Sequence, residues 1–80
     1  MPSYPFIRLS DTPAGSSVRI RHVHSRPEIS TRLREMGFYE DVIVRCITRT
    51  HGNLICEILN TRIGIDGDLA NGIIVSPAEQ

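Results

Sequence analysis

The chain has 80 residues, enough for one small domain that buries roughly 60 to 65% of its unfolded surface. Nine arginines balance nine acidic residues, and this zero net charge argues against a general electrostatic grip on nucleic acid. The sequence has no apolar run of about 20 residues, so no membrane span is predicted, and two cysteines are too few for a disulfide scaffold. The N-terminus lacks a signal-peptide pattern, so we expect a cytoplasmic protein with reduced thiols and no membrane insertion.

The N-terminal residues 1–8 are expected to form an arm, because residues 1–5 contain two prolines and no periodic pattern. The first predicted strand covers residues 17–23, where apolar and polar side chains alternate. This alternation places Val18, Ile20 and His22 on one face of the strand.

A helix of about three turns is predicted to follow, ending at Gly37. Ile29, Leu33 and Met36 lie four and three residues apart, which places them on one face of a helix. A glycine after the last periodic residue can end a helix by adopting a left-handed conformation. We expect this apolar stripe to face the core, with most of the remaining chain packed around it as strands.

The start of this helix carries two further signals. Ser25 and Glu28 have the spacing of a capping box, in which each side chain binds a backbone N–H of the other residue. Pro27 falls in the first turn, where a missing N–H costs little. The helix is therefore predicted to begin just after Ser25.

A hairpin is predicted from two apolar segments that flank a turn at residues 49–53. Pairing Cys46 with Cys56 sets apolar residues against each other on one face, and Arg45 against Glu57 on the other. A slip of one residue would place Arg45 opposite a core side chain, so this register is favoured. Both cysteines then point inward, and we expect buried thiols, with a cross-strand disulfide or a metal pair as alternatives.

The C-terminal third is predicted to form a third strand at residues 62–65, a helical turn at 66–70 and a final strand at 73–75. Asp66 is expected, with Asp68, to cap the helical turn. Residues 76–80 are expected to form a flexible tail. Five short strands and one helix in this length indicate a mainly β protein with one α-helix, folded as a small, partly open β-barrel.

Candidate metal ligands are few. His22 and His24 lie two residues apart and can share a strand face, but zinc sites usually have three or four protein ligands. His51 falls in the predicted hairpin turn and could join them only from a second chain. No serine or cysteine has a base and an orienting acid at a recognisable spacing, so no catalytic residue and no enzymatic activity are predicted.

A candidate partner surface follows from the outer side of the helix. Arg32 and Arg34 lie off the apolar stripe, and Phe38 and Tyr39 come directly after the helix. Arginine and aromatic side chains beside a loop are typical anchors of protein interfaces. A plain solvated helix face is the alternative interpretation.

Four short motifs occur in the order and spacing of a known family. They are Leu9 with Gly15, residues 32–38 (RLREMGF), Val44 with Cys46, and the apolar positions of residues 63–75. Together they resemble the FeoA family, the small cytoplasmic proteins of bacterial ferrous iron transport, over residues 9–75. The resemblance implies an SH3-like barrel over that range.

The chain departs from the family pattern at two places. It has Glu40-Asp41 where the family usually has Pro-Gly, and Thr12 where the family has a leucine. A Pro-Gly turn places its second residue at positive φ, and aspartate tolerates this conformation better than most residues. We therefore expect the turn to survive, with Glu40 and Asp41 added to the candidate partner surface.

The resemblance implies a non-enzymatic interaction protein that docks on the cytoplasmic GTP-binding part of FeoB, the membrane ferrous iron transporter. No cofactor is expected, apart from an adventitious or regulatory divalent transition metal. The alternative is a metal-sensing regulatory domain, because the fold also resembles the C-terminal domain of iron-dependent repressors. An SH3-like nucleic-acid binder is disfavoured by the neutral charge.

Overall fold

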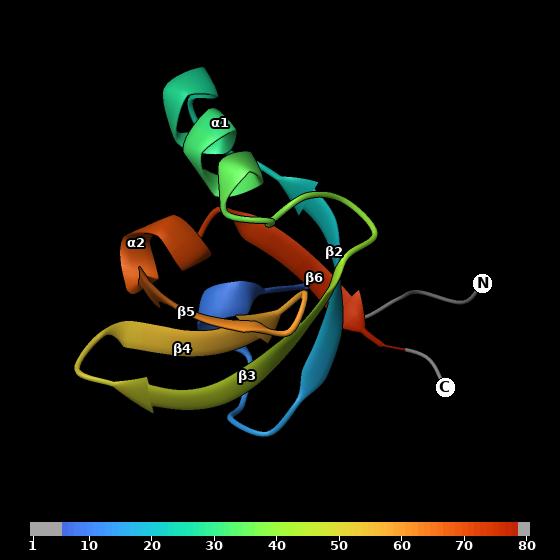
Figure 1. Ribbon diagram of the computed structural model, residues 1–80, viewed down its shortest axis with the longest axis vertical. Helices are drawn as coiled ribbons and strands as arrows, with labels where there is room; N and C mark the ends of the chain where they lie inside the picture. Colours follow the sequence, from blue (N-terminus) through green and yellow to red (C-terminus); the bar gives the residue numbers. More distant parts are fainter. Residues whose placement is uncertain (1–5, 79–80) are drawn as a thin grey trace.

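Six strands form one antiparallel sheet in residues 6–78, the part of the chain that this computed structural model describes (Figure 1). Their order across the sheet is β1-β6-β2-β3-β4-β5, and two helices and a 3₁₀ turn complete the domain. The elements are β1 (Ile7–Arg8), η1 (Leu9–Asp11), β2 (Ser17–Val23), α1 (Pro27–Glu35), β3 (Ile43–Thr50), β4 (Asn53–Ile58), β5 (Thr61–Asp66), α2 (Gly67–Ala70) and β6 (Ile73–Pro77). The expectation of a mainly β, partly open barrel is confirmed.

The sixth strand comes from the segment predicted to be an arm. Ile7 pairs with Val75 and Arg8 with Ile74, which makes β1 an edge strand beside β6. At the other terminus β6 continues to Pro77, and the N–H of Ala78 donates to the carbonyl of Ser17 at 3.1 Å. The remainder of the predicted arm and tail, residues 1–5 and 79–80, lies outside the described residues.

The predicted capping box at the start of α1 is wrong. Arg26 is the N-cap, in an extended conformation and without a side-chain cap, and Pro27 is the first helical residue. Proline disfavours the helical conformation in the residue before it, so the helix cannot begin earlier. Ser25 instead accepts a hydrogen bond from the Ser30 hydroxyl at its carbonyl, at 3.4 Å.

The end of α1 agrees with the prediction. Gly37 has a φ of 101°, and its N–H donates to the carbonyl of Arg34 at 3.0 Å. The next N–H, of Phe38, reaches back to the carbonyl of Leu33 at 2.9 Å. These two bonds form a Schellman motif, in which the residue after the glycine usually packs against the helix.

The helix does not organise the barrel as expected. Figure 1 shows α1 at one end of the molecule, above the strands, rather than at their centre. Of its predicted stripe, Leu33 is fully buried, whereas Ile29 and Met36 are partly buried against the core. Most core side chains come from the inner faces of the strands, because a curved sheet can bury its inner face against itself.

A β-bulge in β2 corrects the predicted facing of His22. Ile20 pairs with Val75, but the register with β6 then shifts, so that His22 pairs with Ile74 and Val23 with Ile73. A bulge inserts one extra residue and reverses the alternation beyond it. Val23 therefore packs against the core, and His22 is exposed instead of sharing a face with Ile20.

The predicted hairpin register is confirmed. Cys46 pairs with Cys56 and Arg45 with Glu57, and a bulge separates these pairs from the rest of the hairpin. The turn is shorter than predicted, because only His51 and the glycine after it lie between β3 and β4. Both have positive φ, 44° and 82°, as the two-residue turns of hairpins require.

Candidate functional site

The loop that follows α1 separates two aromatic side chains that were predicted to lie together. Phe38 is 1% exposed and belongs to the core, so its place in the predicted partner surface is wrong. Tyr39, the next residue, is 41% exposed. The Schellman motif decides this difference, since it turns the first residue after Gly37 inward.

Hydrogen bonds hold the rest of this loop against β2. The N–H of Asp41 donates to the carbonyl of Ile20 at 2.8 Å, and the Arg19 guanidinium donates to the carbonyl of Asp41 at 3.1 Å. Nδ1 of His22 lies 3.8 Å from a carboxylate oxygen of Glu40. Sequence reasoning missed these partners, because the β2 residues gave no local signal of contact with the loop.

Asp41 adopts the predicted left-handed conformation, with a φ of 74°. Aspartate tolerates this region better than most residues, and here both its N–H and its carbonyl are hydrogen-bonded. The turn therefore keeps the shape expected of Pro-Gly while it presents two carboxylates. These two positions are where the sequence differs in charge from the family pattern that it resembles.

A shallow depression of about 490 Å³ brings together four of the six predicted partner residues, Arg34, Tyr39, Glu40 and Asp41. We call these four residues the loop surface. Arg32 is exposed, as predicted, but it lines a different groove, of about 230 Å³, between α1 and β5. Arg32 and Arg34 thus lie on different sides of α1.

The predicted metal ligands do not form one group. The rings of His22 and His24 lie 5.8 Å apart between centroids, and both residues are exposed. Within the described residues, no cluster of three or more histidine, cysteine, aspartate or glutamate side chains could hold a metal ion. The two imidazoles therefore fall short of the three or four protein ligands that zinc usually takes.

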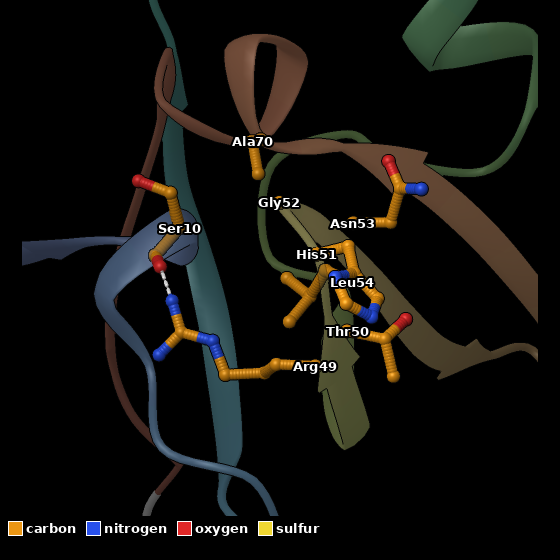
Figure 2. A pocket seen from close by; sticks show the side chains of 9 residues that line it. Ser10, Arg49, Thr50, His51, Gly52, Asn53, Leu54 and Ala70 are labelled. Atoms are coloured by element: carbon orange, nitrogen blue, oxygen red, sulfur yellow. Dashed lines mark hydrogen bonds between the residues drawn. The ribbon is translucent and has the colours of Figure 1, made fainter.

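His51 belongs to a separate pocket of about 250 Å³ at the tip of the β3–β4 hairpin (Figure 2). In this pocket the Arg49 guanidinium donates a hydrogen bond to the backbone carbonyl of Ser10. That bond ties the hairpin to η1 across a separation of 39 residues. No sequence pattern indicated the pocket, because its residues come from distant parts of the chain.

The two cysteines are buried free thiols, as predicted. The N–H of Cys46 donates to the carbonyl of Ser16, and the carbonyl of Cys46 accepts from the N–H of Gly15. Both backbone groups of Cys46 therefore point away from β4. Cys46 and Cys56 are therefore a non-hydrogen-bonded pair, in which opposite side chains approach most closely. A hydrogen bond from Cys56 and the charge of Arg49 lower the pKa of Cys46, although burial acts to raise it. The pKa of Cys56 is raised because it donates that bond and is buried.

These shifts predict a loss of stability in alkali. Above the ordinary thiol pKa of 9.0, the unfolded chain loses both thiol protons, while the folded chain keeps the one on Cys56. The folded state then binds one more proton, so the free energy of unfolding should fall by up to about 1.4 kcal/mol per pH unit. Urea unfolding at several pH values between 9 and 10 measures this slope.

The matched control for this prediction is the double variant Cys46→Ala with Cys56→Ala. It lacks both thiols, so its stability should vary less between pH 9 and 10 than that of the wild type. Equal slopes in the two proteins would contradict the assignment.

Within residues 6–78, no helix has both the length and the apolar character needed to cross a membrane.

Comparisons with known proteins agree with this fold. The model of the FeoA domain family matches residues 7–77, whereas no curated protein matches the sequence. The Stenotrophomonas maltophilia FeoA protein, solved with zinc and described as an SH3 domain protein, is 25% identical, with a TM-score of 0.74 over 88% of this chain and 89% of that one. An iron uptake regulatory protein (FeoA) is 18% identical, with a TM-score of 0.84 over 91% and 97%.

A manganese-dependent transcriptional repressor has the same fold in part of its chain. It is 17% identical, with a TM-score of 0.87 over 98% of this chain. The match spans only 45% of the repressor's length, so it relates this chain to one part of that protein. At this identity the likeness shows the fold alone.

Proposed function

Because this chain belongs to the FeoA family, whose proteins are accessories of iron transport, we propose that it docks on the cytoplasmic GTP-binding part of a FeoB-like ferrous iron transporter and supports or regulates uptake. Docking needs no chemistry from this chain, and we propose that it acts without catalysis of its own. The S. maltophilia relative is described as a suggested ferrous iron transport activating factor, which supports this assignment.

The observation that carries the docking site is the loop surface. It combines a half-exposed tyrosine with one basic and two acidic side chains around a single depression. Tyrosine and arginine are enriched among the residues that dominate binding energy in interfaces. The charges of Arg34, Glu40 and Asp41 would select a partner with complementary charges.

The rigidity of the loop favours the same site. One backbone hydrogen bond, to Ile20, and one from the Arg19 side chain hold Asp41 against β2, and the buried Phe38 anchors the other end of the loop. A surface that is already ordered loses less conformational entropy on binding than a mobile loop does. The loop surface is therefore better prepared for docking than the exposed, helical Arg32.

A titration of the soluble GTP-binding domain of the transporter, followed by calorimetry, tests the proposal. Tyr39→Ala should weaken binding by about tenfold or more, because an anchoring aromatic side chain typically contributes more than 1 kcal/mol. His51→Ala, at the distant hairpin tip, is the matched control and should bind like the wild type. Absence of binding at high micromolar concentration would count against the docking, and equal binding of Tyr39→Ala would count against the site.

Metal sensing, the alternative function, has weaker support. The fold is shared with part of the manganese-dependent repressor, but that likeness concerns the fold alone. Of the predicted ligands, only His22 and His24 lie near each other. Two exposed imidazoles would hold a divalent transition metal only weakly, so we favour docking.

A further inference from the structure

β5 forms one end of the sheet and pairs with β4 alone. One long edge of β5 therefore has no strand beside it in the part of the chain described here. Such an edge presents a row of backbone N–H and C=O groups that can pair with another strand. β5 is six residues long, so the edge is long enough for a regular ladder.

The pairing with β4 determines which residues face this edge. Ile58 and Thr61 flank a two-residue turn, and in such hairpins the flanking pair exchanges two backbone hydrogen bonds. From there the direction of the backbone groups alternates along β5. Arg62, Gly64 and Asp66 consequently direct their N–H and C=O groups away from β4, and all three residues are exposed. The carbonyl of Asp66, the N-cap of α2, also accepts the first hydrogen bond of that helix.

We propose that β5 pairs with the β5 strand of a second copy of this chain, antiparallel and about a two-fold axis at Gly64. In this register Arg62 lies opposite Asp66 of the second copy, and Gly64 lies opposite its own counterpart. Each residue that directs its backbone outward meets another that does the same. A shift of one residue would break this match, and a shift of two would place either Arg62 or Asp66 opposite Gly64.

The charges on the outer face support this register. Across the sheet, Arg45 lies opposite Glu57, and Glu57 lies opposite Arg62. This row alternates in sign and ends at the open edge with a positive charge. Asp66 of the second copy would continue the alternation, and opposite charges on facing strand positions stabilise pairing. Because the axis is two-fold, the same contact occurs twice.

The inner face offers apolar contact beside the same edge. Ile63 is half-buried, and in the proposed register it lies opposite the buried Ile65 of the second copy. The groove of about 230 Å³ between α1 and β5 borders this segment and is lined by the partly buried Ile29 and Met36. Apolar side chains from the second copy can therefore lose contact with water at this edge.

The association should be weak, because one short strand pair buries less area than a standard interface. We expect a dissociation constant on the order of 0.1 to 1 mM. Sedimentation velocity of the full chain from 20 μM to 2 mM, under reducing conditions, should show a monomer–dimer equilibrium. A protein that stays monomeric throughout this range would overturn the proposal.

Charge reversal tests the register. Arg62→Asp sets two aspartates against each other twice, and Asp66→Lys does the same with cations, so each variant should dimerise about tenfold more weakly or worse. Mixing the two variants should restore association, since every facing pair is then of opposite sign. Circular dichroism verifies that Asp66→Lys remains folded without the Asp66 cap of α2.

Arg34→Asp makes the same charge change on the loop surface and should dimerise like the wild type. Dimerisation that is insensitive to Arg62→Asp, or a mixture that stays monomeric, would overturn the register.

Amide hydrogen exchange gives an independent readout. The amides of Arg62, Gly64 and Asp66 should gain protection as concentration rises, whereas those of Ile63 and Ile65 should be protected throughout. Association with uniform protection along β5, or with none, would exclude strand pairing.

Discussion

Replacing Phe38 by alanine is expected to lower the free energy of unfolding by about 3–5 kcal/mol, the range of buried phenylalanine truncations. Phe38 is 1% exposed and is the largest of the fully buried side chains among residues 6–78. Since a domain of this kind is stable by only about 5–15 kcal/mol, the variant should be close to unfolding at 37 °C. Urea unfolding followed by circular dichroism measures the difference.

Tyr39→Ala is the matched control, because it truncates an adjacent aromatic side chain that is 41% exposed. Its free energy of unfolding should change by no more than about 1 kcal/mol, since surface truncations rarely cost more. The two variants thus separate a residue needed for folding from a residue proposed for docking. A larger loss of stability from Tyr39→Ala than from Phe38→Ala would contradict the structure of this loop.

Replacing Gly72 by alanine is the second large effect. A Cβ at this position would lie 2.6 Å from the carbonyl oxygen of His24 and 2.8 Å from the Ser25 hydroxyl. The segment cannot move aside freely, because the N–H of His24 donates to the carbonyl of Gly72 at 2.7 Å. We expect a loss of about 2–3 kcal/mol, typical of overpacking against backbone.

Gly64→Ala is the control for this substitution. Its Cβ would meet only the terminal Cδ1 of Ile55, at 3.3 Å, and that flexible side chain can give way. Stability should therefore change by no more than about 0.5 kcal/mol. Chemical shifts of the α1 amides should move in Gly72→Ala and stay in place in Gly64→Ala. Equal effects of the two substitutions would show that the close approach to His24 does not constrain the fold.

Sequence reasoning reached the loop surface in part. It identified Arg34 because this residue lies off the apolar stripe of the helix, and Tyr39 and the two carboxylates because they follow a helix end that a glycine marks. It also included Phe38, since two adjacent aromatic residues look alike without the hydrogen bonds that orient them. The structure separates the two through the bond from the Phe38 N–H to Leu33, which turns this side chain inward.

What the sequence determined by itself rests on neighbouring residues. Alternation of apolar and charged side chains set the β3–β4 register, and Pro27 and Gly37 set the ends of α1. The left-handed conformation of Asp41 was instead implied by the resemblance, which has Pro-Gly at residues 40 and 41. Each of these features depends on sterics or side-chain facing within a short stretch, so it can be recognised without the rest of the chain.

Tertiary structure alone decided the features that need two distant segments. The bulge in β2 exists only in register with β6, and it turned His22 outward against the local alternation. Likewise, Gly72 occurs in a sequence typical of a tight turn, but its structural constraint is the close approach of His24. Hydrogen bonds and steric contacts between remote segments override local preference here, because they form only once the strands have assembled around the core.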